Sequence, residues 1–388
     1  MDNYDTHICT QYGDHPAEHK GAVSPPIYQT SLFAFESFEA FTQAQTKERE
    51  NYVYTRGVNP TTELLEMKLA KLERGEKCKC FGSGMGAISS VFFSLLESGD
   101  HVLFVNDIYG PTKQLITFFH KFNITYTTAY DDVESHIQPN TRVIYVESPG
   151  TMNMNVIHLE SISALGKKYG IYTVIDNTWS TPLFQKPLTH GFDLSIHSLT
   201  KYIGGHSDVT GGAVIGSHAL VDKIFEFGFQ LNGSTLSPQD ASLIIRGLRT
   251  LPIRMQQHQQ NALMVIDYLK TKEEIAKIYH PSLLKVKEYP YIRHQMKGYS
   301  GVLSIELKEG GFENVAAFIN SLTLFKIGVS WGGYESLVNS PIKPHNADEL
   351  IKAGISTGLV RFSIGLESPH SLISDLENAF QSISLTKS

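Results

Sequence analysis

Cysteine is scarce in this chain of 388 residues, which contains only Cys9, Cys78 and Cys80. An odd and sparse set of thiols excludes a disulfide framework. It is typical of proteins kept in a reducing cytoplasm, where we expect this one. Cys78 and Cys80 stand one residue apart and away from other candidate ligands. They therefore predict strand residues rather than a zinc site, and we expect no metal.

Long apolar runs and a strong charge excess are also missing. No run of 18 apolar residues occurs, so we expect no membrane-spanning helix. Residues 1–7 do not show the basic-then-apolar order of a secretory signal. Lysine and arginine number 33 against 39 aspartates and glutamates, a net charge of -6. This mild acidity gives no reason to expect a nucleic acid or an anionic membrane as a partner.

Hydrophobic periodicity indicates an α/β protein. From residue 61 onward, segments with apolar residues at helical spacing alternate with short apolar runs. We expect helices at 61–74, 85–96, 113–122 and 159–169, and strands at 101–106, 142–147 and 171–175. Such alternation predicts a mostly parallel sheet covered on both faces, with ligands at the carboxyl ends of its strands.

With 388 residues, 41% of them hydrophobic, the chain is long enough for two domains. We expect these two domains to follow an N-terminal arm. Residues 1–55 show few periodic stretches and predict an irregular N-terminal arm, either wrapped around a neighbouring subunit or disordered. Residues 56–250 would form the large domain. After a long helix at 255–270, strands with antiparallel alternation predict a smaller α+β domain over 251–388.

Lys201 and Asp176 carry the most specific chemistry in the sequence. Each follows an apolar, strand-like run, and their spacing fits one strand–connection–strand unit. The pair suits pyridoxal phosphate. The amine forms a Schiff base with the cofactor aldehyde, and the carboxylate keeps the pyridine nitrogen protonated so that the ring accepts electrons. Taken singly, Asp176 could cap the next segment and Lys201 could be an ordinary solvated lysine.

A glycine-rich turn could hold the phosphate of such a cofactor. Residues 81–87 read FGSGMGA and precede an expected helix, so the backbone could approach an anion at a helix N-terminus. No Gly-Lys-Ser/Thr follows, which excludes a P-loop, and a tight strand-to-helix turn explains the pattern about as well. Ser198 and Thr200, on either side of Leu199, offer hydroxyl groups to the same phosphate.

Tyr109 and Arg361 complete the candidate site. Tyr109 follows the expected strand 101–106, where its ring could stack on a cofactor; the simpler reading is a turn tyrosine. Arg361 lies in an apolar stretch of the C-terminal region, where its planar fork could grip a substrate carboxylate at two points. A lone arginine is more often a surface ion-pair partner, so this role depends on the Lys201–Asp176 setting.

In order along the chain, these motifs resemble the Cys/Met metabolism family of pyridoxal phosphate enzymes. The family includes cystathionine β-lyases, γ-lyases and γ-synthases and methionine γ-lyases. The resemblance covers most of the chain and rests on YTRGVNPT at 54–61, SGM at 83–85, DNT at 176–178, TKY at 200–202, GHSD at 205–208, RGLRTL at 246–251 and SWGGYESL at 330–337. It implies an α/β fold of the aminotransferase-like fold type I, pyridoxal 5'-phosphate as cofactor, and a homo-oligomer. The oligomer would be a dimer with shared active sites, usually paired into a tetramer.

The resemblance also implies residue roles. Lys201 would hold the cofactor covalently and Asp176 would pair with its ring nitrogen. The phosphate would be held by Gly84, Met85, Ser198 and Thr200, with Tyr54 and Arg56 from the neighbouring subunit. Tyr109 would stack on the ring and take part in catalysis. The substrate would be bound by Arg361, Ser330 and Trp331.

Within the family, residues 147–154 (ESPGTMNM) and 330–334 (SWGGY) look most like bacterial cystathionine β-lyases. Val329 stands where γ-synthases and γ-lyases usually carry glutamate, although methionine γ-lyases can carry an apolar residue there. Thr151 stands where many members carry an asparagine that helps to bind the substrate carboxylate.

We therefore expect a carbon–sulfur lyase of methionine biosynthesis. It would cleave a sulfur amino acid, L-cystathionine, by β-elimination to homocysteine, pyruvate and ammonia. Three alternatives stay open at this point. One is γ-elimination or γ-replacement on sulfur amino acids or homoserine-derived substrates. The others are an aminotransferase of the same fold and a non-catalytic oligomer with a degenerate pocket.

Overall fold

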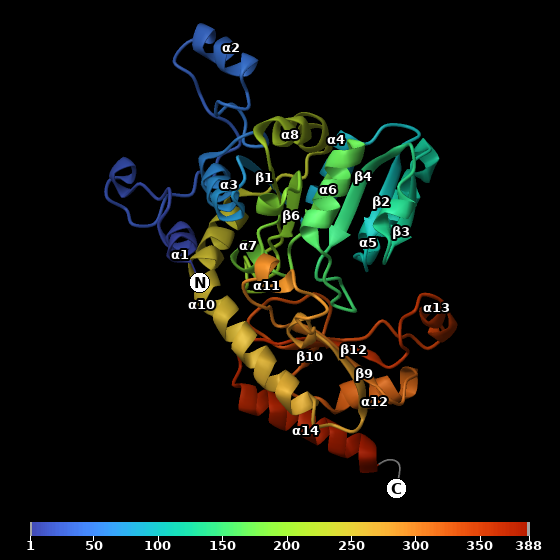
Figure 1. The fold of residues 1–388 in the computed structure, drawn as a ribbon. Coiled ribbons are helices and arrows are strands. Elements are labelled where there is room, and N and C mark those ends of the chain that lie inside the picture. The colour runs from blue at the N-terminus through green and yellow to red at the C-terminus, as the bar shows by residue number, and fades with distance from the viewer. Residues whose placement is uncertain (1, 386–388) are drawn as a thin grey trace.

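A seven-stranded sheet organises the larger half of the computed structural model, which describes residues 2–385 (Figure 1). Its strand order is β1-β7-β6-β5-β4-β2-β3. The strands are β1 (Lys77–Phe81), β2 (His101–Val105), β3 (Thr125–Ala129), β4 (Thr141–Glu147), β5 (Tyr172–Asp176), β6 (Leu194–Ser198) and β7 (Gly212–Gly216). Of these strands, β7 alone runs opposite to the other six, so the mostly parallel α/β sheet expected from the sequence is confirmed.

Helices cover both faces of this sheet, which is why its strands read as continuous apolar runs. In β4, Val143 and Tyr145 pack in one apolar cluster with residues of α4 and α5, and Ile144 and Val146 pack in another with residues of α6. The helices of this half are α3 (Pro60–Glu73), α4 (Gly84–Leu95), α5 (Gly110–Phe119), α6 (Leu159–Tyr169), α7 (Thr181–Phe184), α8 (His218–Lys223) and α9 (Gln230–Asn232), and a π-helical turn spans Ile224–Phe229.

α3 ends at Glu73, one residue before the expected end of the helix at 61–74. The left-handed turn falls on Arg74, whose φ is 62°. Gly75 is needed for a different reason, because a Cβ atom there would lie 2.5 Å from the side chain of Ile215. The glycine therefore lets α3 pack closely against β7.

The N-terminal arm is more regular than expected. It contains α1 (Asn3–Thr10) and α2 (Phe38–Thr46). α1 buries Ile8 and Cys9 completely against the large half, so this part of the arm belongs to the subunit's own core. Figure 1 shows α2 standing away from the body of the molecule, with Phe38 74% exposed. The expected irregular structure over residues 1–55 is thus wrong for these two segments.

The long helix α10 (Pro238–Leu269) joins the two halves, running from the large half into the small one in Figure 1. Its residues 241–255 pack in the large core and its residues 262–269 in the small core. The expected helix at 255–270 is therefore the second part of a longer one. Because α10 crosses position 250 without a break, the division of the chain at 250/251 stays a prediction.

A second, five-stranded sheet organises the small half, in the order β10-β11-β12-β9-β8. The strands are β8 (Ile275–Tyr279), β9 (Val302–Leu307), β10 (Lys326–Ile327), β11 (Leu337–Asn339) and β12 (Leu359–Ser363), and the helices are α11 (Ile292–Gln295), α12 (Phe312–Ser321), α13 (Ala347–Lys352) and α14 (Pro369–Leu385). β9 and β12 pair antiparallel, as their alternation predicted. Within residues 2–385, no helix is both long and apolar enough to cross a bilayer.

Candidate active site

The carboxyl ends of β4, β5 and β6 gather the candidate groups at one edge of the large sheet. Glu147 and Asp176 are register partners at the ends of β4 and β5. Ser198 ends the neighbouring strand β6, and Lys201 follows in a turn, its amide donating to the Ser198 carbonyl at 3.2 Å. The sequence correctly placed these residues at strand ends, although Lys201 itself lies just beyond its strand.

Lys201 is held in a partly desolvated pocket. Its Nζ donates to Ser330 Oγ at 2.5 Å and lies 5.5 Å from the centre of the Trp331 ring. Burial, followed by the charge of Arg361, lowers the pKa of Lys201 to about 8, against the opposing effect of Asp176. An amine with this pKa is partly neutral near pH 7 and can act both as nucleophile and as base.

Asp176 is held by Thr178, which donates both its amide, at 3.0 Å, and its hydroxyl to Asp176 Oδ1. Burial raises the pKa of Asp176, while the bonds from Thr178 and the nearby charges of His197 and Lys201 lower it. A protonated ring nitrogen is the cation that such a buried carboxylate would pair with. The residue therefore suits the role expected from the sequence.

Glu73, which was not predicted from the sequence, stabilises this edge of the sheet through buried hydrogen bonds. Its fully buried Oε1 accepts from Asn177 Nδ2 at 2.8 Å, from Ser195 Oγ at 2.9 Å and from His197 Nε2. Burial opposes ionisation of Glu73, but the bond and charge of His197 and the bond from Asn177 outweigh it and lower the pKa. Because these donors adjoin Asp176 and Ser198 in sequence, Glu73 fixes the ends of β5 and β6.

The glycine-rich turn forms an anion cradle at the N-terminus of α4. The Ser83 side chain caps the helix by accepting from the Gly86 amide at 2.9 Å. The amides of Gly84 and Met85 have no acceptor among the described residues, so they can bind an anion. A Cβ atom at Gly84 would lie 3.1 Å from Ser198 Cβ, which shows how closely this turn approaches β6.

Thr200 lies on the same side but is partly engaged, since its Oγ1 accepts from the Gly211 amide at 3.0 Å. The Thr200 hydroxyl also donates to the Gly211 carbonyl at 3.4 Å, a long bond that it can exchange for one to a phosphate oxygen. Together with Lys201 and Asp176, the cradle offers an amine, a carboxylate and anion-binding amides. This donor set fits pyridoxal 5'-phosphate.

Arg361, in β12, is a partly buried cation without a hydrogen bond or ion pair to any described residue. Burial lowers its pKa, against the opposing effects of Asp107, Glu147 and Tyr109. Buried charges are usually paired, so an unpaired guanidinium marks a place for an external anion. Its position suits the carboxylate role expected from the sequence.

A tight loop carries Ser330 and Trp331 to Lys201. Gly332 has a φ of 84°, and a Cβ atom there would lie 2.8 Å from the Tyr202 amide nitrogen and 3.3 Å from Lys201 Cα. The Gly332 amide also donates to Ser363 Oγ at 3.2 Å. The loop therefore packs directly against the backbone of the Lys201 turn, which explains the glycine in the SWGGY motif.

Tyr109 and Thr151 both bind to Glu147, which the sequence placed at the carboxyl end of a strand but to which no role was assigned. The Tyr109 amide donates to Glu147 Oε1 at 2.7 Å, and the Thr151 hydroxyl donates to Glu147 Oε2. Burial and the neighbouring Asp176 raise the pKa of Glu147 well above its usual range. Tyr109 keeps its ring 45% exposed beside the site, whereas the Thr151 hydroxyl is already engaged. The end of an apolar strand was the available signal for Glu147.

Tyr54 and Arg56 lie outside this cluster. Arg56 Nη1 donates to the Gln230 carbonyl at 2.8 Å, and its guanidinium carbon lies 5.7 Å from the centre of the Tyr54 ring. None of their described contacts reaches Lys201, Asp176 or Arg361. Within one subunit, these two residues are therefore not brought to the candidate site.

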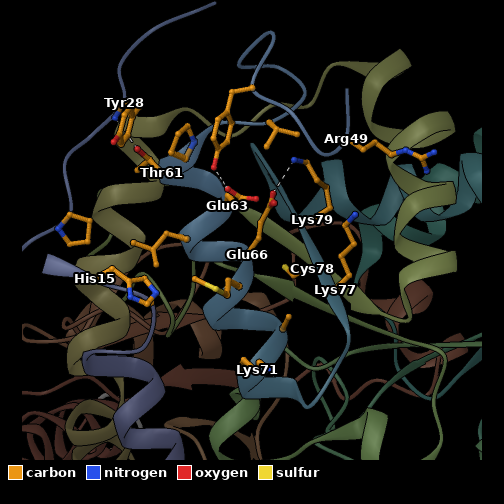
Figure 2. A pocket seen from close by; sticks show the side chains of 18 of the residues that line it. His15, Tyr28, Arg49, Thr61, Glu63, Glu66, Lys71, Lys77, Cys78 and Lys79 are labelled. Carbon is orange, nitrogen blue, oxygen red and sulfur yellow. Dashed lines mark hydrogen bonds and ion pairs between the residues drawn. The ribbon is translucent and has the colours of Figure 1, made fainter. Parts of the chain in front are cut away.

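A cavity of about 700 Å³ lies between the arm, α3 and β1, and Figure 2 shows its lining. Two of its carboxylates are already engaged: Glu66 Oε1 lies 3.0 Å from Lys79 Nζ, and Glu63 accepts from the Tyr52 hydroxyl. None of its lining residues belongs to the Lys201 cluster. We therefore assign the chemistry to the sheet edge and not to this cavity.

A lysine, an aspartate and an anion cradle at the carboxyl edge of a mostly parallel sheet define a pyridoxal phosphate enzyme of fold type I. Residues 6–381 match the family described as Cys/Met metabolism PLP-dependent enzyme, and the chain belongs to that family. Its members include carbon–sulfur lyases and synthases that act on sulfur amino acids.

Similar proteins carry several activities. The chain is 40% identical over 374 residues to an L-methionine gamma-lyase of Fusobacterium nucleatum subsp. polymorphum, covering 94% of each chain. It is 37% identical to a cystathionine beta-lyase of Lactococcus lactis subsp. cremoris (strain MG1363), covering 93% of this chain and 94% of that one. The structure of a cystathionine gamma synthase from Xanthomonas oryzae pv. oryzae superposes with a TM-score of 0.90 at 34% identity over 100% of both chains.

Proposed function

We propose that this protein is a carbon–sulfur lyase that cleaves L-cystathionine by β-elimination. The reaction consumes one water and gives homocysteine, pyruvate and ammonia. The observation that carries the proposal is Lys201, a partly buried amine with a pKa of about 8 beside the unpaired Arg361. β-Elimination needs one base at Cα and one proton for the departing sulfur, and a single amine of this kind can serve both steps.

Substrate binding and proton transfer would be carried out by residues of the chain, and the electrons would be taken up by the cofactor. When bound, the cofactor supplies an electron sink for the pair left at Cα. Arg361 would hold the substrate carboxylate and so fix the orientation of Cα. Ser330, bonded to Lys201 Nζ, would hold the amine toward the substrate before it removes the Cα proton. Lys201 or the half-exposed Tyr109 would donate a proton to the leaving sulfur.

The ring and the phosphate of the cofactor would be bound by residues that lie around Lys201. Asp176 would keep the ring nitrogen protonated, and Tyr109 would stack on the ring. The phosphate would be held by the amides of Gly84 and Met85 and the hydroxyls of Ser198 and Thr200. Trp331, beside Lys201, would line the side of the pocket that receives the substrate chain.

Tyr54 and Arg56 give a reason to propose a homo-oligomer. They lie outside their own subunit's cluster, so we infer that they complete the phosphate site of a second copy in a dimer. Such dimers could pair into tetramers. We also propose that the chain divides by function into an arm at 1–55, a cofactor-binding domain at 56–250 and a smaller domain at 251–388.

γ-Elimination is the second candidate, and the similarity to a methionine gamma-lyase favours it. Val329, 79% exposed beside Ser330, stands where γ-synthases and γ-lyases usually carry glutamate. Because methionine γ-lyases can carry an apolar residue there, Val329 is compatible with this second candidate. The two reactions differ in their oxo acid, because β-elimination of cystathionine gives pyruvate and γ-elimination gives 2-oxobutyrate.

The deciding experiment is to follow the oxo acid released from L-cystathionine and, separately, from L-methionine. We expect pyruvate from cystathionine and little turnover of methionine. Release of 2-oxobutyrate as the main product from either substrate would replace the β-lyase proposal by the γ-lyase one. A Lys201→Ala variant should lose both the yellow absorbance of the bound cofactor and nearly all turnover; retention of both would overturn the assignment of Lys201.

A further inference from the structure

Three metal-ligating side chains meet on the surface, away from Lys201. Glu160 lies in the first turn of α6, His190 ends the short helix Pro187–His190, and His294 lies in α11. The Nδ1 atom of His190 is 3.1 Å from Glu160 Oε1, and the Nε2 atom of His294 is 3.5 Å from the same oxygen. All three ligand atoms lie within 4.8 Å of one another.

The two separations from Glu160 Oε1, 3.1 and 3.5 Å, are close to those of a tetrahedral zinc site. Nitrogen and oxygen ligands bind Zn²⁺ at about 2.0–2.2 Å, which places tetrahedral neighbours about 3.3–3.6 Å apart. One nitrogen of each imidazole approaches the same carboxylate oxygen, so the two rings and the carboxylate face a common point.

We propose that Glu160, His190 and His294 bind one Zn²⁺ ion, with water at the fourth position. Two imidazoles and one carboxylate suit zinc better than the harder magnesium or calcium ions. The three cysteines do not compete for the metal, because all are buried. No local sequence pattern indicates this site, because its ligands come from three segments that lie apart along the chain.

The metal would tie α11 to the large half. Gln295, next to His294, already docks α11 there: its Nε2 donates to the Ile157 carbonyl at 2.8 Å, and its Oε1 accepts from the Leu159 amide at 3.2 Å. These contacts hold the α11 backbone beside the start of α6, while the side chains of His294 and Glu160, 74% and 51% exposed, stay accessible to a metal ion in solution. The alternative is that protonated histidines simply form ion pairs with Glu160 and no metal binds.

The test measures zinc binding to the holoenzyme, freed of excess cofactor and of chelating buffer, by competition with a chromophoric zinc indicator. We expect about one Zn²⁺ per chain, and at least a tenfold loss of affinity in a Glu160→Gln, His190→Asn double variant. His370→Asn, at an exposed histidine of the small half, is the matched control and should bind zinc like the unmodified enzyme.

Two further readouts separate a built site from ion pairing. Co²⁺ bound tetrahedrally should give visible absorption bands, and zinc should raise the melting temperature of the holoenzyme but not of the double variant. The far-ultraviolet circular dichroism of the double variant checks that it folds. Equal zinc affinity in the double variant and the His370→Asn control, or no saturable binding to the unmodified enzyme, would overturn the proposal.

Discussion

At the scale of single residues, the environment of Lys201 explains how one amine could serve both cofactor capture and proton transfer. Its pKa of about 8 results mainly from burial and then from the charge of Arg361. An ordinary lysine would be almost fully protonated at neutral pH and would be neither nucleophile nor base. The unpaired Arg361 therefore has two effects, as a proposed carboxylate site and as a means of keeping Lys201 partly neutral.

This environment predicts the pH dependence of cofactor capture. Only the neutral amine reacts with the cofactor aldehyde, so the rate at which the cofactor-free enzyme captures pyridoxal phosphate should rise about tenfold per pH unit below the pKa of Lys201 and level off above it. The midpoint is expected near pH 8, measured by stopped-flow absorbance. In Arg361→Leu the lost positive charge should raise the pKa and move the midpoint to higher pH. A midpoint near the ordinary lysine value of 10.5 in the unmodified enzyme would contradict this account.

At the scale of elements, the loop from Ser330 to Gly333 depends on its contact with the Lys201 turn. Gly332→Ala should strain a positive φ and also force the new methyl group against the Lys201–Tyr202 backbone. We expect a destabilisation of about 2–4 kcal/mol and weaker cofactor binding, measured by denaturant unfolding and by cofactor titration.

Gly354→Ala is the matched control for this variant. Gly354 also has a positive φ, of 69°, but nothing lies within 4 Å of its added Cβ atom. It should show the backbone strain alone, about 1–2 kcal/mol, with cofactor affinity unchanged. Equal effects of the two substitutions on cofactor affinity would show that the loop contact has no role in the site.

The Glu73 network makes a second prediction at this scale. Glu73→Gln keeps the shape of the side chain but removes the charge that accepts three buried hydrogen bonds. Loss of a buried charged partner typically costs about 3–5 kcal/mol, so urea unfolding should shift strongly. Glu134→Gln removes a solvated ion pair with Lys168 and should change little. A shift no larger for Glu73→Gln than for Glu134→Gln would refute the role given to Glu73.

Local patterns predicted the elements better than the contacts between them. Strand ends, helix periodicity and the order of motifs were enough to place Lys201, Asp176 and the sheet. Glu73 was missed because its partners lie more than a hundred residues away along the chain, and burial of a glutamate leaves no local pattern. The arm was misjudged for a similar reason, since α1 is fixed by burying Ile8 and Cys9 in a core that the sequence does not display.

At the scale of the whole molecule, the position of Tyr54 and Arg56 allows a direct test of shared sites. An Arg56→Ala subunit retains Lys201, and a Lys201→Ala subunit retains Arg56. If each site takes Arg56 from the neighbour, both variants should be nearly inactive alone. Random mixing should then restore about a quarter of normal activity, because about half the dimers are hybrids and each hybrid has one complete site. No recovery after denaturation and co-refolding, with the unmodified enzyme recovering, would rule out sharing.

The three buried thiols can be used to detect local unfolding, because each becomes reactive only when the structure around it opens. Burial raises the pKa of Cys9 to about 12 and raises those of Cys78 and Cys80. Thiol reagents need an exposed thiolate, so labelling should be slow until the surrounding structure gives way. Cys9 lies in α1 and the other two in β1, so peptide-resolved mass spectrometry should detect detachment of the arm before rupture of the sheet. Simultaneous labelling of all three would mean that arm and sheet open as one unit.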